Sequence, residues 1–213
     1  MKSLSFSRVT FADLQKLVQI EQISRQDLFD EWFGFAYALR DEERETLQKL
    51  IERNWRYVLS YSEDELKIKF IGPLLNLVDF QRDGVRDWYQ RPLQTIIHDV
   101  TLHGYVDFMV ARGVKEPDRP YFFIQEFKKT KFEVDPEDQL LAEMLAALTL
   151  NQVEVMRGAY IIGQEWRFVI LRKIAPDAYE YAVSLIFDCL NIDHLERIYT
   201  NLQAVKYQYC IAE

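Results

Sequence analysis

The sequence predicts an α/β fold in which a mixed central sheet of about five strands is flanked by helices and preceded by a helical extension. Apolar residues recur with a helical period in the first third of the chain and with a period of two after about residue 95. Strand-like and helix-like segments then alternate, which is typical of a mixed sheet with helices on both faces. The chain has 213 residues, of which 49% are hydrophobic, so it can bury one sizeable core.

The change from a helical period to a period of two predicts two parts within this one domain. Residues 1–60 would form a helical extension packed on the core, and residues 61–213 would form the core with a C-terminal helical tail. Only 7 glycines and 6 prolines are present, so a long flexible linker between the parts is not expected.

Three helices with wide, aromatic apolar faces are expected in residues 1–60. The first would run from Thr10, as N-cap, to Gln22, because a threonine oxygen can accept the free N–H groups of a first turn. The second would cover Gln26–Leu39, and the third would run from Asp41, as N-cap, to about Leu59. Such faces most simply pack on the core, although an exposed patch would make them an oligomer or partner surface.

A fourth helix is expected to begin after Ser62, the N-cap of the segment SEDELKIKFIGPLLNLV. Three acidic residues at positions 63–65 fill its first turn, where carboxylates complement the positive end of the helix dipole. The pair Gly72-Pro73 would kink this helix or restart it, because proline lacks a backbone N–H.

The strands are expected after the polar stretch at residues 81–92. Two strand-like halves occupy Ile96–Ala111, and Tyr121–Lys129 is apolar on both faces, as a central strand should be. A helix would then open with Asp135 as N-cap and proline at its first position. The segments GAYIIG and WRFVILRKI should form a hairpin, and residues 177–206 should be mostly helical.

The charge and the cysteines restrict the classes of function. The formal net charge is -8, which argues against loose, non-specific sliding on DNA, although a local basic cleft could still bind nucleic acid. Cys189 and Cys210 provide neither a disulfide framework nor a CxxC metal pair. The N-terminal segment lacks the features of a signal peptide, and no apolar run approaches the ~20 residues that cross a bilayer. We therefore expect a soluble, cytoplasmic protein without a membrane partner.

Three ionisable residues lie within the predicted strands. Asp107 is surrounded by apolar residues in GYVDFMVA, which is a costly place for a carboxylate without a partner. Glu126 and Lys128 in YFFIQEFKK are two residues apart, so both side chains project from the same face of a strand. If the two strands are neighbours, all three groups converge on one place.

Such a cluster suits a hard divalent cation. Two carboxylates, a backbone carbonyl and water molecules can hold Mg²⁺, and the ammonium of Lys128 can orient a metal-bound water and offset charge on an attacked phosphate. This is chemistry for hydrolysing a phosphodiester. The alternative is a structural ion pair between Glu126 and Lys128, with Asp107 capping a turn.

The segment from about Glu63 to Ile174 resembles the PD-(D/E)XK nuclease superfamily, which has the restriction-endonuclease-like fold. Asp107, Glu126 and Lys128 match its signature of an Asp on one strand followed by (Asp/Glu)-x-Lys on the next. The helix beginning at Glu63 is similar to the first core helix of members such as the N-terminal nuclease domain of type I restriction subunits.

The resemblance implies further site residues. Glu63, with Glu65 as second choice, would join Asp107 and Glu126 in the metal site, and Gln139 fits the Gln of a Gln-x-x-x-Tyr motif that some branches carry. Two departures are Val106, where many members have proline, and Glu143, where those branches have tyrosine. The latter puts the role of Gln139 in doubt.

The resemblance thus implies a Mg²⁺- or Mn²⁺-dependent nuclease acting on nucleic acid, with DNA the expected substrate. Asp107, Glu126 and Glu63 would bind the metal, and Lys128 would position the attacking water. The alternative is a non-catalytic interaction or scaffold protein that retains the nuclease fold. In that case the N-terminal helices would form a homodimer or partner surface.

Overall fold

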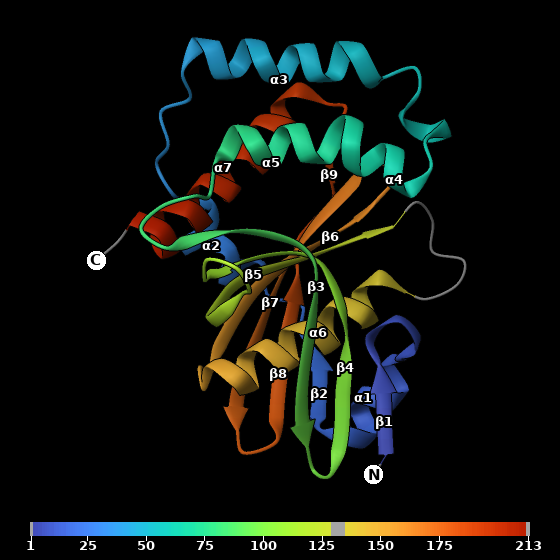
Figure 1. Cartoon of the computed structure of the whole chain (residues 1–213). Coiled ribbons are helices and arrows are strands. Elements are labelled where there is room, and N and C mark those ends of the chain that lie inside the picture. The colour runs from blue at the N-terminus through green and yellow to red at the C-terminus, as the bar shows by residue number, and fades with distance from the viewer. Residues whose placement is uncertain (1, 129–134, 212–213) are drawn as a thin grey trace.

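The chain folds around a mixed sheet with helices against both of its faces (Figure 1). The computed structural model describes residues 2–128 and 135–211. The predicted α/β class is confirmed, but the expected number of about five strands is wrong, because the described residues contain nine. The strands are β1 (Lys2–Ser5), β2 (Gln19–Gln22), β3 (Val85–Ile97), β4 (Val100–Arg112), β5 (Asp118–Lys128), β6 (Val155–Ile162), β7 (Glu165–Ala175), β8 (Ala178–Val183) and β9 (Phe187–Asp188).

The strands lie in the order β1-β4-β5-β6-β7-β8-β2, while β3 pairs with β4 and β9 pairs with β7. Three pairings are parallel (β1 with β4, β5 with β6, β2 with β8), and the others are antiparallel. The helices are α1 (Phe11–Leu17), α2 (Asp30–Phe33), α3 (Asp41–Asn54), α4 (Glu63–Leu66), α5 (Gly72–Val78), α6 (Pro136–Asn151) and α7 (Ile192–Lys206). Among the residues that the structure describes, no helix combines the length and the apolar character needed to span a membrane.

The sheet curls around α6 (Figure 1). Every residue of α6 from Gln139 to Leu148 is buried, because this helix contacts strands β3 to β7. Asp135 caps its start by accepting the backbone N–H of Glu137, and Pro136 occupies its first position, as the sequence predicts. A helix enclosed in this way must be apolar on all sides, which explains why its sequence shows no polar face.

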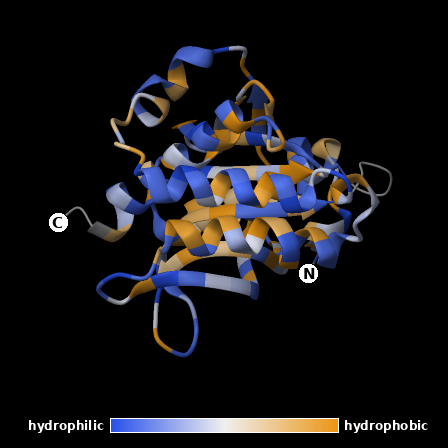
Figure 2. Cartoon of the chain, turned by 90° about the horizontal axis from the view of Figure 1, so that it is seen from above, coloured by the Kyte–Doolittle hydropathy of each residue, from blue (hydrophilic) through white to orange (hydrophobic). Residues whose placement is uncertain are grey.

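Two hydrophobic cores lie on the two faces of the sheet. One core contains α6 with residues such as Ile124 and Val169, and the other contains α2, α3, α5 and α7 with residues such as Phe108 and Phe168. Figure 2 shows hydrophilic residues along the outer parts of the helices and hydrophobic residues in the strands beneath them. Adjacent residues of β5 therefore point into different cores, which places Glu126 on the α6 side together with Ile124.

Residues 1–60 are not only helical, because they supply β1 and β2 to the sheet. The helix predicted from Thr10 begins where expected, and the Thr10 side chain accepts the N–H of Asp13. It ends at Leu17, however, and β2 follows at once. Both strands are four residues long and mostly polar, so they are too short for an alternating pattern to be read from the sequence.

The second and third predicted helices also differ from the structure. In place of one helix over Gln26–Leu39, a 3-10 turn (Gln26–Phe29) leads into the single turn of α2. Helix α3 starts at Asp41, but Arg40 is its N-cap, and α3 ends at Asn54. Aromatic residues in these segments pack against the sheet without helical periodicity, so tertiary contacts outweigh the local pattern.

The predicted fourth helix begins at Ser62 with a complete capping box to Glu65. The pair Gly72-Pro73 does not interrupt it, because a π-helical turn over Lys67–Ile71 joins α4 directly to α5. Such a turn adds one residue to the helix and leaves a carbonyl free ahead of the proline, which lacks an N–H. The π-helical turn lies over the candidate site described below.

The polar stretch at residues 81–92 is largely strand, because β3 extends from Val85 to Ile97. It pairs only with β4 among the described residues, so its charged side chains reach solvent and its proline is tolerated. His98 and Asp99, both with positive φ, form the turn to β4. The tail over 177–206 is also mixed, because β8 and β9 precede α7. The hairpin of β6 and β7 is confirmed.

Gly158 on β6 allows α6 to lie close to the sheet. A Cβ at this position would be 2.9 Å from the Ile124 carbonyl oxygen and 2.9 Å from Met144 Sδ. We expect Gly158→Ala to lower the free energy of unfolding by about 2 kcal/mol, since overpacking a rigid core costs about 1–3 kcal/mol. Urea denaturation would measure this loss, and an unchanged midpoint would show that α6 can move away freely.

Candidate metal centre

The sheet divides at the middle of β4. Along one side, β4 pairs with β3 from Val100 to Arg112 except at Asp107. Along the other side, β1 pairs with residues 100–103 and β5 pairs with residues 108–112, so residues 104–107 face the gap between β1 and β5. Pairing with β5 begins at Phe108 opposite Gln125, and the same register continued by one residue sets Asp107 opposite Glu126. The strands that carry Asp107 and Glu126 are therefore neighbours, as expected.

Asp107 lies at a local break in the pairing of β3 with β4. Tyr89 pairs with Phe108 and Arg91 pairs with Val106, but Gln90 between them has a φ of 50° and does not pair with Asp107. Val106 and Met109 pack in the same core, which shows that the strand is distorted between them. An undistorted strand would direct them to opposite faces. The break turns the Asp107 carboxylate into the gap.

Both carboxylate oxygens of Asp107 accept hydrogen bonds. Oδ2 accepts the backbone N–H of Phe127 at 3.0 Å, and Oδ1 accepts the side-chain amide of Gln90 and the Lys67 ammonium, the latter at 3.0 Å. The pairing of β4 with β5 ends at Gln125, and Asp107 accepts the backbone N–H of Phe127 just beyond that end. Asp107 thus has a structural role that resembles the turn-capping alternative, and it lies in the predicted site as well.

Lys67 is a site residue that the sequence argument missed. It lies on the π-helical turn, and its Nζ contacts Glu63 Oε1 at 2.7 Å as well as Asp107 Oδ1. Burial lowers the pKa of Lys67, but the charges of Asp107 and Glu63 more than offset it and leave the pKa raised. The four-residue spacing of Glu63 and Lys67 on a helix was the available signal, since such pairs face each other.

Glu126 is completely buried beside Lys128. Lys128 Nζ lies 2.7 Å from Glu126 Oε1, whereas Glu126 Oε2 has no hydrogen-bond partner among the described residues. Burial, and then the charge of Asp107, raise the pKa of Glu126 to about 8. Burial lowers the pKa of Lys128, but Glu126 and the other carboxylates nearby more than offset it, so the pKa is raised. The predicted triad is therefore brought together in space.

Glu143 on α6 is a second residue that the sequence argument did not assign to the site. It is fully buried, and Gln139 Nε2 donates to its Oε1 at 3.0 Å. Its Oε2 has no hydrogen-bond partner within residues 2–128 and 135–211. Burial, and then the charge of Glu126, raise the pKa of Glu143. The predicted Gln139 thus contacts the site through Glu143, the residue that stands where the motif would have tyrosine.

Asp107 and Glu126 are the two carboxylates of this cluster that could bind a divalent cation. No three His, Cys, Asp or Glu side chains in the described part of the chain lie close enough together to bind one ion, so Glu63 does not join Asp107 and Glu126. Glu63 instead pairs with Lys67. Magnesium often uses only one or two protein carboxylates and keeps several waters. The unpaired Glu126 oxygen, opposite Asp107, is the atom that such an ion would satisfy.

An open groove leads from solvent to Asp107. It has a volume of about 410 Å³ and lies between the turn of Lys67–Ile71, the start of α5 and the edge of β3. Tyr89, Gln90, Asp107 and Ile68 are among the residues that line it. Of the residues around the candidate site, Lys67, Gln90 and Asp107 line this groove, whereas Glu126 and Lys128 do not.

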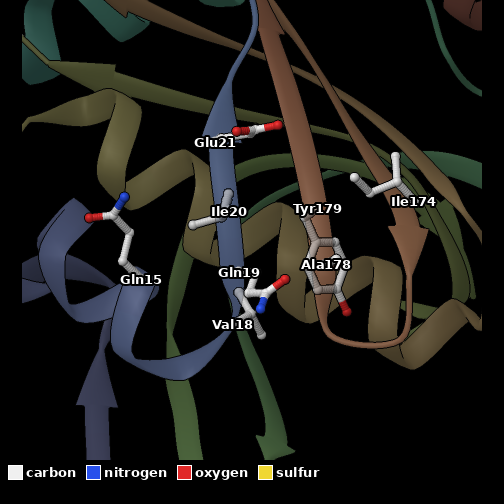
Figure 3. A pocket seen from close by; sticks show the side chains of 8 residues that line it. All are labelled: Gln15, Val18, Gln19, Ile20, Glu21, Ile174, Ala178 and Tyr179. Carbon is white, nitrogen blue, oxygen red and sulfur yellow. The ribbon is translucent and has the colours of Figure 1, made fainter.

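A second hollow of about 410 Å³ lies at the far end of the sheet (Figure 3). Its walls are α1, β2 and the hairpin of β7 and β8, and Glu21 is the one carboxylate among its lining residues. No buried ionisable cluster comparable to that around Asp107 lines this hollow. The groove beside Asp107 is therefore the better candidate for a reactive site.

Lys129 at the end of the predicted central strand lies outside the described residues. The resemblance to the nuclease superfamily rests on the residues named above, since no protein-family model and no curated protein matches this chain.

Proposed function

We propose that this chain is a metal-dependent nuclease with a restriction-endonuclease-like core, which hydrolyses phosphodiester bonds of nucleic acid. The observation that carries the proposal is the buried Glu126. It lies on the strand next to that of Asp107, opposite this residue, and its Oε2 has no hydrogen-bond partner among the described residues. Burying a carboxylate with an unpaired oxygen is expensive, and a bound cation would offset that cost. Lys128 Nζ lies 2.7 Å from Oε1 of the same carboxylate.

The residues of the site have separate roles under this proposal. Asp107 and Glu126 would hold Mg²⁺ or Mn²⁺, which when bound polarises a phosphate oxygen and acidifies a water. Lys128, with its ammonium 2.7 Å from Glu126, would orient the attacking water and offset negative charge on the phosphate. Gln90 and the Phe127 N–H fix the orientation of Asp107. Gln139 and Glu143 would support Glu126 from α6.

The net charge of -8 also bears on the substrate. Such a surface gives little general attraction for a nucleic acid, so local cations must position the phosphate. Lys67 and Lys128 are both partly exposed at the candidate site. We propose DNA as the substrate, in line with the superfamily resemblance.

A non-catalytic interaction protein is the second candidate function. The observation that favours it is a group of exposed apolar side chains just after α3, in which Trp55 is 54%, Tyr57 55% and Leu59 72% exposed. Apolar side chains that stay exposed together often mark a partner surface. Light scattering that shows a monomer, together with the failure of this region to bind any partner, would argue against this function.

The direct test is a cleavage assay. Purified protein would be incubated with plasmid, linear duplex and single-stranded DNA in Mg²⁺ or Mn²⁺, beside Lys128→Ala and an EDTA control. We expect cleavage that requires the metal, and a loss of about a hundredfold or more in Lys128→Ala, since one group that stabilises the transition state contributes about that much. Cleavage that survives both EDTA and the substitution would overturn the proposal.

A further inference from the structure

A second buried charge lies in a different cavity. Arg157 on β6 is 9% exposed, and it lines a cavity of about 810 Å³ between α2, the start of β6 and the C-terminal π-helical turn. Glu126 lies on the neighbouring strand, pairs with Tyr160 and faces α6, whereas Arg157 lies near Trp32 of α2 on the other face. The two sites are therefore on opposite sides of the sheet.

The guanidinium of Arg157 is incompletely paired. One terminal nitrogen donates to the Tyr209 hydroxyl at 2.6 Å, and the ring of Trp32 lies 5.7 Å from the guanidinium carbon. The other terminal nitrogen is 3.9 Å from Glu31, whose side chain is 86% exposed, so solvent screens that contact. Nε has no hydrogen-bond partner among the described residues. Among the described residues, this buried cation therefore has one neutral partner and one screened partner, and no close anion.

The remaining walls indicate the shape of the ligand. Leu28, Val155, Ile170 and Tyr209 give the cavity apolar surface, and Arg172 adds a second cation that is partly engaged by Glu180 at 3.4 Å. Glu31 and Glu154 also line the cavity, but both are exposed, so their charges act at the rim. An anionic head at Arg157 with an apolar body along these walls matches this distribution.

We propose that this cavity binds a small molecule that carries a carboxylate or phosphate group, with Arg157 as the residue that binds the anion. The planar fork of arginine suits two oxygens of either group, and the low local dielectric strengthens the contact. The inference is independent of the nuclease proposal, because it uses neither Asp107 nor Glu126.

Calorimetric titration of the full chain tests this site. The probes are sodium phosphate and sodium benzoate, in EDTA, with the ionic strength held constant by sodium chloride. We expect saturable binding of at least one probe. Binding by phosphate alone would indicate a phosphate head, and tighter binding by benzoate would indicate a carboxylate on an apolar body.

Three variants decide which residues bind the probe. Arg157→Met should weaken binding about tenfold or more, since a charge-assisted contact contributes at least that factor. Val155→Trp should do the same by filling the cavity, and it serves if Arg157→Met fails to fold, because Val155 is partly exposed. Arg53→Met on α3 is the matched control and should bind as the wild type does. The inference is overturned if neither probe binds, or if Val155→Trp and a folded Arg157→Met bind as tightly as the wild type.

Discussion

Asp107→Asn should reduce metal-dependent DNA cleavage by about a thousandfold or more while the protein stays folded. Asparagine keeps an oxygen for the Phe127 N–H and a similar shape, so the end of the β4–β5 ladder can survive the change. It removes the negative charge that would hold the cation. Losing several kcal/mol of transition-state stabilisation corresponds to about this factor in rate. Initial rates on plasmid DNA in Mg²⁺ would measure the effect.

The choice of asparagine separates chemistry from folding. Asp107→Ala would also leave the buried backbone N–H of Phe127 without its acceptor. That variant could lose activity simply by unfolding. Asp30→Asn on α2 is the matched control, because Asp30 is exposed, and its cleavage rate should equal that of the wild type. Wild-type cleavage by Asp107→Asn would remove Asp107 from the proposed mechanism.

Glu126→Gln should stabilise the protein increasingly as the pH rises from about 5 to about 8. The pKa of Glu126 is raised from 4.5 to about 8 by burial and by the charge of Asp107. Between these values the folded protein retains a proton that the unfolded chain has released, so wild-type stability falls with increasing pH. Glutamine carries no charge and escapes this loss. The difference should reach on the order of 3 kcal/mol near pH 8.

Urea denaturation at several pH values would measure this difference, with Glu52→Gln on the exposed face of α3 as the control. The same experiment tests cation binding without an activity assay. At pH 8, Mg²⁺ should raise the stability of the wild type more than that of Glu126→Gln, because only the wild type presents a second carboxylate. A stability difference that is constant from pH 5 to pH 8 would contradict the assigned pKa shift.

The sequence predicted the centre of the site better than its surroundings. Asp107, Glu126 and Lys128 could be found because a charge inside an apolar strand is conspicuous, and because alternation sets Glu126 and Lys128 on one face. Lys67 could not be placed, since its contact with Asp107 depends on how α4 packs over the sheet. Glu143 was recognised only as a departure from a motif, because the sequence of α6 does not show which strands lie against each of its buried residues.

The sequence predicted the α/β class, but it did not predict strands β1, β2 and β3 at their observed positions. The central strands are apolar and long enough to show a period of two, whereas β1 and β2 are short and mostly polar. Their conformation is imposed by partners far along the chain. The same holds for β3, where solvent-facing charges hide the alternation.

The pairing of the first strands has a consequence for the order of folding. Lys2 pairs with Val100 and Gln19 with Ala178, so the two outermost strands of the path from β1 to β2 both come from the start of the chain. The segment β1–α1–β2 therefore links the two ends of this strand path. During synthesis this segment is made before β4 and β8, so β1 and β2 stay unpaired until those partners have been made. Contacts of such long sequence separation slow folding, so β1 and β2 should be the last strands to gain protection from hydrogen exchange.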